Sequence, residues 1–328
     1  MNAVFLLSLT LLYTMYSQAT DNLCSRRTTL SMAILNGDNH LSSHSIQQTL
    51  VKTSTQCVQR CLYHIPKCTF IAYYEVTGSC EIYSIEPGYQ VEEILFPSNV
   101  KLYGLINRDC TEVKQFSSGN SGVYNVKPCP SCSPSKVYCD METDEHGWTV
   151  LQRRRDDSVD FYRTWEEYTD GFGDVCNEFW IGNEFIHKIT SSAVHELRID
   201  LIDYDDNHNF VTYDSFRIEN EFEKYRLRLG NYISLQSNIR DSLRNQDNCQ
   251  FSTKDKDNDN GNGDCAKMYP SGWWFNACFY VNLNGNGFSA EVPNADTSKG
   301  ITWLINESTS TRRQYRFSEM KIRRIGPF

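Results

Sequence analysis

Three aspartates alternate with polar residues in a glycine-rich segment near the end of the chain, at Asp255, Asp257 and Asp259. Such alternation gives neither a helix nor a strand an apolar face, so hydrophobic packing alone cannot order this segment. Carboxylate oxygens, together with the backbone carbonyls that glycine leaves accessible, are ligands that calcium prefers. The segment therefore predicts a calcium loop, and the alternative interpretation is a solvated acidic loop.

The spacing excludes a calcium site of the helix–loop–helix (EF-hand) type. Counted from Asp255, that pattern needs glycine at the sixth position and glutamate at the twelfth, where the sequence has Asn260 and Ala266. Two cysteines, Cys265 and Cys278, follow the aspartates and bracket a pair of tryptophans. Acidic residues, cysteines and tryptophans therefore lie together in one short segment.

Motifs of catalysis are absent from the sequence. The seven histidines fall in no H-E-x-x-H spacing, and neither a G-x-S-x-G nucleophile turn nor a phosphate-binding glycine loop occurs. A second aspartate cluster, Asp203, Asp205 and Asp206, follows a predicted strand, and we interpret it as a solvated turn. We therefore expect a binding protein and not an enzyme.

The elements that position these residues follow from hydrophobic patterning. Residues 194–204 place Leu197, Ile199 and Leu201 on one face, which predicts a half-buried antiparallel strand. Residues 225–229 alternate in the same way, and residues 184–190 have the apolar spacing of a short helix. Regular patterning ends near residue 231, so the segment that carries the aspartates must be ordered by cross-links or metal.

Short aromatic, glycine and cysteine motifs occur in a characteristic order between residues 109 and 325. They include Asp109-Cys110, Val137-Tyr138-Cys139-Asp140-Met141, Gly147-Trp148-Thr149-Val150-Leu151-Gln152-Arg153-Arg154, Glu178-Phe179-Trp180-Ile181-Gly182-Asn183, Asn282-Leu283-Asn284-Gly285 and Glu319-Met320-Lys321-Ile322-Arg323. This series resembles the fibrinogen C-terminal domain family, which includes the fibrinogen β and γ chain globes, ficolins, tachylectins and tenascin tails. The resemblance implies an α+β fold, an antiparallel sheet with short helices and a loop-rich subdomain that holds calcium and ligand.

The resemblance also implies the calcium ligands. They are the side chains of Asp257 and Asp259 and the backbone carbonyls of Gly261 and Gly263, with water completing the shell and Asp255 and Asp264 adding charge nearby. Two carboxylates and two carbonyls make a modest site, so a Kd of about 10⁻⁴ to 10⁻³ M is expected, as for other extracellular modules.

A ligand pocket lies beside the calcium loop in the acetyl-binding lectins of this family. The resemblance places it at the Ala277–Cys278 peptide bond, which it implies to be cis, with the amides of Cys278 and Phe279 pointing at an acetyl carbonyl. Tyr269 matches one aromatic wall, and Trp274 is a further candidate. Phe279 stands where the family usually has histidine, and two expected tyrosines are missing, which makes a poorer pocket.

Thirteen cysteines indicate an oxidising compartment, because disulfide bonds persist there. The family pattern implies two bonds in the C-terminal domain, Cys110–Cys139 and Cys265–Cys278. Four further cysteines are additions to that pattern, and their pairing stays open. One interpretation joins Cys176 to Cys249, because both lie in loops that flank family motifs, and joins Cys129 to Cys132.

A second cysteine framework occupies residues 24–106, around an aromatic strand-like run at residues 70–74. It resembles the PAN/apple module, which implies the bonds Cys57–Cys80 and Cys61–Cys68 and a helix beginning near Ser54. The alternative is a disulfide-rich cap of another kind. Because the cysteine total is odd, one thiol remains, and we expect it at Cys24, where it could link two chains into a homo-oligomer.

The N-terminus predicts export. Residues 2–19 have an apolar core and no charged residue, and they end in Ser17-Gln18-Ala19, as in a secretory signal cut after Ala19. A retained signal anchor is the alternative. No later run is long enough for a membrane span. The expected domains are thus a signal peptide (1–19), a PAN/apple-like module (24–106) and a fibrinogen C-terminal domain (107–328). The sequon at Asn306 could carry a glycan.

Two functions remain open from the sequence. The first is a secreted, calcium-dependent lectin of innate immunity that binds acetylated carbohydrates. The second is a matrix or adhesion protein whose fibrinogen-like domain binds an extracellular protein. The net charge of −9 argues against nucleic acid and anionic membrane as the main partner.

Overall fold

The computed structural model describes residues 45–50, 52, 56, 70–74, 77–83, 100–104, 107–116, 120–129, 131–285 and 300–326. The chain divides into two compact units, Met1–Val126 with Asp140–Gly147, and Lys127–Cys139 with Trp148–Phe328. Among the described residues, no helix is both long and apolar enough to cross a membrane. The predicted signal peptide, the helix near Ser54 and the cysteines Cys24, Cys57, Cys61 and Cys68 lie outside the described residues.

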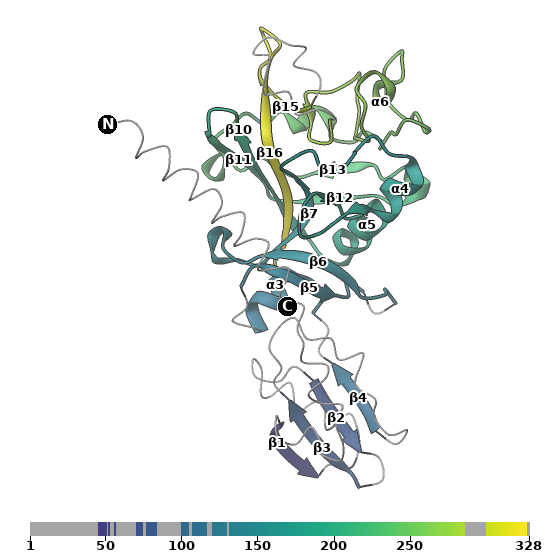
Figure 1. Cartoon of the computed structure of the whole chain (residues 1–328), viewed down its shortest axis with the longest axis vertical. Coiled ribbons are helices and arrows are strands. Elements are labelled where there is room, and N and C mark those ends of the chain that lie inside the picture. The colour runs from purple at the N-terminus through teal and green to yellow at the C-terminus, as the bar shows by residue number, and fades with distance from the viewer. Residues whose placement is uncertain are drawn as a thin grey trace, which may run out of the picture. The chain divides into compact units, whose positions relative to one another are not determined.

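The first unit contains an antiparallel sheet of four strands in the order β1-β3-β2-β4 (Figure 1). These are β1 (Ser45–Leu50), β2 (Phe70–Tyr74), β3 (Ser79–Tyr83) and β4 (Val100–Gly104). The aromatic run at residues 70–74 is an inner strand, and Cys80 on β3 is buried and disulfide-bonded. The unit also holds α3 (Cys110–Phe116), β5 (Gly122–Val126) and the 3₁₀ turn η3 (Thr143–Glu145).

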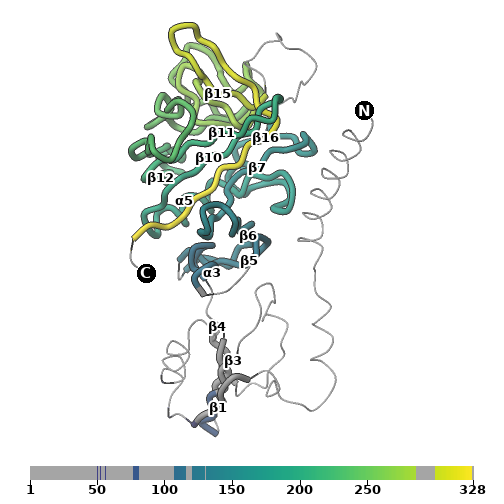
Figure 2. The backbone as a smooth tube through the Cα atoms, turned by 90° about the vertical axis from the view of Figure 1, so that its left-hand side faces the viewer, coloured from purple at the N-terminus to yellow at the C-terminus, as the bar shows by residue number. Residues whose placement is uncertain are grey.

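The second unit is built on a sheet that follows the order β11-β10-β16-β7-β6. The strands are β6 (Ser135–Asp140), β7 (Trp148–Arg154), β10 (His195–Asp203), β11 (His208–Tyr213) and β16 (Thr311–Arg324). Neighbouring pairs from β11 to β7 are antiparallel, and Figure 2 shows these strands running side by side. The predicted strand at residues 194–204 is confirmed as β10, with Leu197, Ile199 and Leu201 buried.

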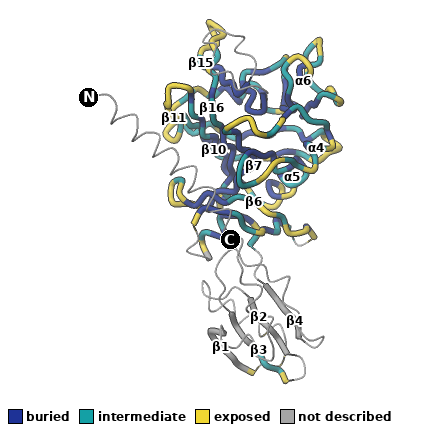
Figure 3. Tube along the Cα trace, in the orientation of Figure 1, coloured by how far each residue is buried: buried dark blue, intermediate teal, exposed yellow. Residues whose placement is uncertain are grey.

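Shorter elements complete this unit. They are α4 (Trp165–Asp170), β8 (Phe172–Gly173), β9 (Phe179–Trp180), α5 (Asn183–Ser192), β12 (Phe216–Ile218), η4 (Glu221–Glu223), β13 (Leu227–Leu229), η5 (Ser234–Gln236), η6 (Leu243–Gln246), α6 (Cys265–Met268), β14 (Val281–Asn282) and β15 (Ile301–Asn306). The predicted helix at residues 184–190 is confirmed as α5, which buries Ile186 and Ile189. Figure 3 shows the buried residues concentrated along the strands and the exposed ones in the surrounding loops.

The aspartates after β10 form the expected turn, but Asp203 is not solvated. Its side chain is buried and accepts hydrogen bonds from the backbone N–H groups of Asp205 (3.0 Å) and Asn207 (2.9 Å). Asp205 and Asp206 are exposed. The interpretation of a wholly solvated cluster is therefore wrong for Asp203, which shapes the turn.

Buried polar side chains of β7 hold the segment that follows the candidate ligand pocket. The side-chain amide of Gln152 donates to the carbonyl of Leu283 at 3.0 Å, and the Arg154 guanidinium donates to the carbonyl of Gly285 at 2.9 Å. Both side chains are fully buried. Backbone carbonyls at the end of β14 are satisfied in this way although they lie beyond the strand pairing.

Arg154 is balanced by Glu178, which is also fully buried. The Glu178 carboxylate lies 3.6 Å from Arg154 Nε and accepts backbone hydrogen bonds from residues 155–157 and from Val159, at 2.7–3.1 Å. Burial lowers the pKa of the Arg154 guanidinium, and the Glu178 charge opposes that effect. Removing one partner of a buried charge pair is costly, because the other charge then stays buried with less compensation.

We therefore expect Glu178→Ala to lower the free energy of unfolding by about 3–5 kcal/mol, because it removes the fully buried partner of Arg154 and leaves only the partly exposed Asp157 carboxylate, at 3.1 Å. Denaturant titration would measure the loss. Glu166→Ala is the matched control, since Glu166 is exposed on α4 and should change the free energy by less than about 0.5 kcal/mol. A Glu178→Ala protein as stable as the control would contradict the role assigned to this pair.

Candidate calcium loop and ligand pocket

The acidic loop is closed at its base by backbone and covalent contacts. Ser252 and Trp273 exchange two backbone hydrogen bonds, at 2.9 and 3.1 Å. The Cys265–Cys278 disulfide implied by the family resemblance is present and spans 13 residues. Closing a loop of that length stabilises the folded chain by about 3 kcal/mol in the chain-entropy account. The loop is thus ordered without a hydrophobic core of its own.

Asp259 is the organising side chain of the loop. One carboxylate oxygen accepts from Gly261 N–H at 2.7 Å, and the other accepts from Cys265 N–H at 2.8 Å. Burial raises the pKa of Asp259, the two backbone donors oppose this, and the nearby charge of Asp257 raises it further. A carboxylate whose ionisation is disfavoured by burial and by a neighbouring negative charge lies where a cation would be stabilised.

Glycine at position 261 leaves room for the close approach of two expected ligand oxygens. A Cβ atom there would lie 3.0 Å from the Asp259 carboxylate and 3.4 Å from the Gly263 carbonyl. The described residues contain no cluster of three or more His, Cys, Asp or Glu arranged for a metal. The calcium shell expected from the family resemblance does not need such a cluster, because it combines two side-chain carboxylates with two backbone carbonyls. The donor set therefore fits calcium, with Asp257, Asp259, Gly261 and Gly263 as the residues that would hold it.

The neighbouring aspartates have structural roles that the sequence did not reveal. Asp255 accepts hydrogen bonds from Trp165 N–H (2.9 Å) and from the Thr253 hydroxyl (2.8 Å), so it ties the loop to the first residue of α4. Asp264 caps α6 by accepting from Lys267 N–H at 3.0 Å. Both carboxylates are engaged at helix N-termini, where negative charge is favourable.

The candidate ligand pocket contains the expected backbone geometry. The Ala277–Cys278 peptide bond is cis. In the part of the chain that the structure describes, neither Cys278 N–H nor Phe279 N–H has a hydrogen-bond acceptor. Ala277 is exposed and Cys278 half-buried, so two adjacent donors border solvent-accessible residues. The Tyr269 ring meets the Phe279 ring edge-on, with centroids 4.9 Å apart.

Two features of the pocket walls differ from the expectation. Trp274 is wrong as a wall residue, because it is fully buried and its indole N–H donates to the Tyr225 carbonyl at 2.8 Å. Phe279 is only 5% exposed, and the Arg312 guanidinium lies 5.3 Å from its ring. Arg312 also donates to the Phe279 carbonyl at 3.0 Å. The positively charged side chain of Arg312 on β16 thus flanks the candidate pocket. The spacing of residues in the sequence did not predict this contact.

A polar cluster lies immediately beyond Phe279. The Tyr280 hydroxyl donates to Glu307 at 3.0 Å, and Glu307 also pairs with Arg240. Leu304 N–H on β15 donates to the Tyr280 carbonyl, which joins this segment to the β15–β16 hairpin. Asn306 ends β15 and is exposed, so the sequon is accessible.

The cysteines confirm one open pairing and overturn another. Cys129 and Cys132 are joined. Cys176 is disulfide-bonded, but Cys249 is a free, buried thiol, so the Cys176–Cys249 bond is wrong. Cys249 packs in the core, where the Asn260 side chain covers its sulfur at 3.9 Å, while Cys176 lies in a half-buried turn. Cys110 and Cys139 are each disulfide-bonded.

Comparison with known proteins identifies the modules. The family model for the C-terminal globular domain of fibrinogen beta and gamma chains matches residues 106–325. The PAN domain model matches residues 32–110. The first match covers the calcium loop, the pocket and all the motifs of the sequence series.

Curated relatives resemble the same part of the chain. Ryncolin-4 of Cerberus rynchops is 43% identical over 216 residues, which cover 66% of this chain and 61% of that protein. Angiopoietin-4 of Mus musculus is 42% identical over 207 residues, which cover 63% of this chain and 40% of that protein. The chain therefore spans less than two thirds of the length of either relative.

Solved structures share the fold. The fibrinogen-like globe domain of human ANGPTL6 has a TM-score of 0.62 at 35% identity, covering 67% of this chain and 96% of that domain. Lamprey fibrin D-dimer, in complex with the peptide Gly-His-Arg-Pro-amide, has a TM-score of 0.61 at 30% identity, covering 68% and 77%. Identities of 35% and 30% over about two thirds of this chain agree with the resemblance seen in the sequence motifs.

Calcium should stabilise the second unit. With a Kd of about 10⁻⁴ to 10⁻³ M, adding about 2 mM calcium should contribute about 0.6–1.8 kcal/mol. A rise in thermal midpoint would report it, and Asp257→Ala should abolish the rise. Asp205→Ala, an exposed aspartate outside the loop, is the control. Equal calcium responses in both variants would rule out Asp257 as a ligand.

The Cys249 thiol should be unreactive in the folded protein. Burial, with a smaller contribution from the Asp247 charge, raises its pKa to about 11, so its thiolate is about a hundredfold scarcer than for an ordinary cysteine. Maleimide labelling followed by peptide mass spectrometry should modify Cys249 only after denaturation, and Cys249→Ser should remove the label. A disulfide-linked peptide containing Cys176 and Cys249 would contradict the assignment.

Proposed function

This chain belongs to the family of the C-terminal globular domain of fibrinogen beta and gamma chains, and on that premise we propose that it is a secreted, calcium-dependent lectin that binds acetylated carbohydrates. One observation carries the proposal. The N–H groups of Cys278 and Phe279 are adjacent and lack acceptors among the described residues, at a cis bond bordered by the calcium loop. Two successive backbone donors suit a single carbonyl oxygen.

The aromatic side chains supply the rest of this site. Tyr269 stands edge-on to Phe279, and the two rings offer an apolar contact for the methyl of an acetyl group. Arg312 holds the Phe279 carbonyl and so fixes the residue that carries one of the donors. Orientation would come from the backbone donors and apolar contact from the rings. The activity proposed is recognition without catalysis.

The calcium loop would act by holding the pocket in place. Calcium, when bound, supplies positive charge beside Asp257 and Asp259. The Asp259 carboxylate holds Cys265 N–H, and the Cys265–Cys278 bond connects that residue to the pocket. The loop residues therefore position Cys278 through the disulfide bond. For this reason, ligand binding at Cys278 should depend on calcium binding in the loop.

Export and an immune role complete the proposal. The signal-like N-terminus, the accessible sequon at Asn306 and the disulfide-bonded cysteines support a secreted glycoprotein. Recognition of acetylated sugars on microbes, as in the lectins this family includes, is the role that we infer for such a protein.

A second function is favoured by the burial of Phe279. With the ring 5% exposed and the Arg312 guanidinium beside it, Phe279 offers little apolar surface to a ligand. One solved relative is a complex with a peptide ligand. A matrix or adhesion protein that binds an extracellular protein partner through this face is therefore the competing proposal.

Retention on N-acetylglucosamine beads separates the two functions. The wild-type protein should be retained with about 2 mM calcium and released by chelator, because extracellular sites of this kind bind in the 10⁻⁴ to 10⁻³ M range. Asp257→Ala should lose retention, and Asp205→Ala should keep it. If the wild type flows through, or if chelator makes no difference, the lectin proposal fails and the protein-binding function is preferred.

A further inference from the structure

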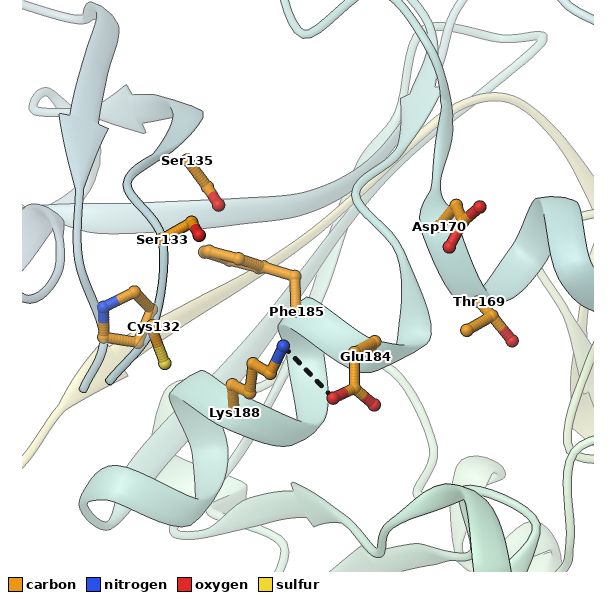
Figure 4. Close-up of a pocket in the computed structure, with 9 residues that line it drawn as sticks. Cys132, Ser133, Ser135, Thr169, Asp170, Glu184, Phe185 and Lys188 are labelled. Atoms are coloured by element: carbon orange, nitrogen blue, oxygen red, sulfur yellow. Dashed lines mark ion pairs between the residues drawn. The ribbon is translucent and has the colours of Figure 1, made fainter. Parts of the chain in front are cut away.

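A cavity of about 200 Å³ lies in the second unit, between α4, α5 and the turn closed by the Cys129–Cys132 disulfide (Figure 4). Three separate segments line it: residues 128–135, the end of α4 and the first turns of α5. It is built from other residues than the calcium loop and the candidate acetyl pocket. None of the functions discussed so far uses it.

One wall of the cavity adjoins a disulfide-closed turn. The Cys129-Pro130-Ser131-Cys132 segment is an addition to the family pattern, and its disulfide is reinforced by a backbone hydrogen bond from Cys132 to Cys129 at 3.0 Å. Ser133 and Ser135 follow directly and line the cavity. The cross-link restricts the turn from which these two residues extend, because a short closed loop leaves little conformational freedom.

The polar groups of the cavity include donors and acceptors without protein partners. Among the described residues, the Asp170 carboxylate and the Ser133 and Ser135 hydroxyls make no hydrogen bond or ion pair. Lys188 pairs with Glu184 at 3.2 Å across one turn of α5, as the dashed line in Figure 4 shows. Both members of this pair line the cavity and are partly exposed, so each keeps hydrogen-bonding capacity.

The mixed charges around the cavity disfavour a simple ion as the occupant. An anion would meet the carboxylates of Asp170 and Glu184, and a cation would meet the ammonium group of Lys188. Hydroxyl groups both donate and accept, so a neutral polyol can satisfy all of these side chains at once. The mixture of groups therefore selects a polyhydroxylated ligand.

Size and shape narrow the ligand to one sugar ring. The cavity of about 200 Å³ is smaller than the roughly 300–1,000 Å³ of pockets for drug-sized ligands. A volume below that range suits a small ligand such as a single six-membered ring with its hydroxyls. The Phe185 ring, which extends toward the serines in Figure 4, provides an apolar surface for the C–H face of such a ring.

We propose that this cavity binds one neutral sugar residue without calcium. The site lies at the C-terminal end of α4, where Thr169 and Asp170 line it, whereas Asp255 of the calcium loop bonds to Trp165 at the N-terminal end. At 1.5 Å per residue, these ends are roughly 8 Å apart along the helix axis. The inference extends the proposed lectin function to a second site but does not depend on the first.

The test is saturation-transfer-difference NMR on the full-length wild-type protein in chelator, with glucose, galactose, mannose and N-acetylglucosamine as probes. At least one sugar should receive saturation. Asp170→Ala should weaken its binding about tenfold or more, the loss expected for a hydrogen bond to a charged group. Ser133→Trp, which fills the cavity from an exposed position, should abolish binding, and Asp205→Ala should leave it unchanged.

Further outcomes separate this site from the calcium-dependent one. Asp170→Ala and Ser133→Trp should both keep the wild-type response to calcium, measured as the rise in thermal midpoint and as retention on the beads. That response would also show that both variants are folded. Absence of any sugar signal in chelator would overturn the proposal. A sugar signal that persists in both Asp170→Ala and Ser133→Trp would also overturn it. Tighter binding of lysine or inorganic phosphate than of the four sugars would overturn it as well.

Discussion

The Cys265–Cys278 disulfide is the interaction on which the candidate site depends. At one end, Cys265 begins α6 and donates its N–H to the Asp259 carboxylate. At the other, Cys278 follows the cis bond and carries one of the two unpartnered donors. The acidic loop has no apolar face, so it cannot be held by packing. A covalent link instead couples the residues that would bind calcium to those that would bind ligand.

The disulfide can act in this way because the surrounding chain is rigid. Trp273 and Trp274 between the two cysteines are fully buried, and the Trp274 ring packs against Trp180 and Phe251. Asp255 fastens the other side of the loop to α4, while Gln152 and Arg154 hold the carbonyls that follow β14. The site is thus a polar loop mounted on an aromatic core, and its order comes from hydrogen bonds, the disulfide and buried rings.

Local patterns predicted much of this structure from the sequence. The alternation of apolar and polar residues predicted β10, and the helical spacing of apolar residues predicted α5. The spacing of aspartates and glycines located the acidic loop. Each of these three patterns involves only residues that are close in the sequence. The family resemblance supplied the disulfide and the cis bond, which no local pattern encodes.

Interactions between distant residues could not be predicted. Asp255 and Trp165 are 90 residues apart, and Arg312 reaches Phe279 across 33 residues. Cys176 and Cys249 each lie beside a family motif in the sequence, yet Cys249 is a free thiol buried in the core. A position beside a motif does not give the distance between two cysteines in the fold. Trp274 was expected at the pocket, but its orientation is set by packing against Trp180. The cavity beside Cys132 combines three segments, so no single stretch of sequence revealed it.

The central claim is that the calcium loop positions the pocket donors through the disulfide. Amide NMR of the isotope-labelled protein during a calcium titration tests this directly. The signals of Gly261 and Gly263 should shift together with those of Cys278 and Phe279, with one common midpoint. Shifts confined to the loop, with the Cys278 and Phe279 signals unmoved at saturation, would contradict the claim.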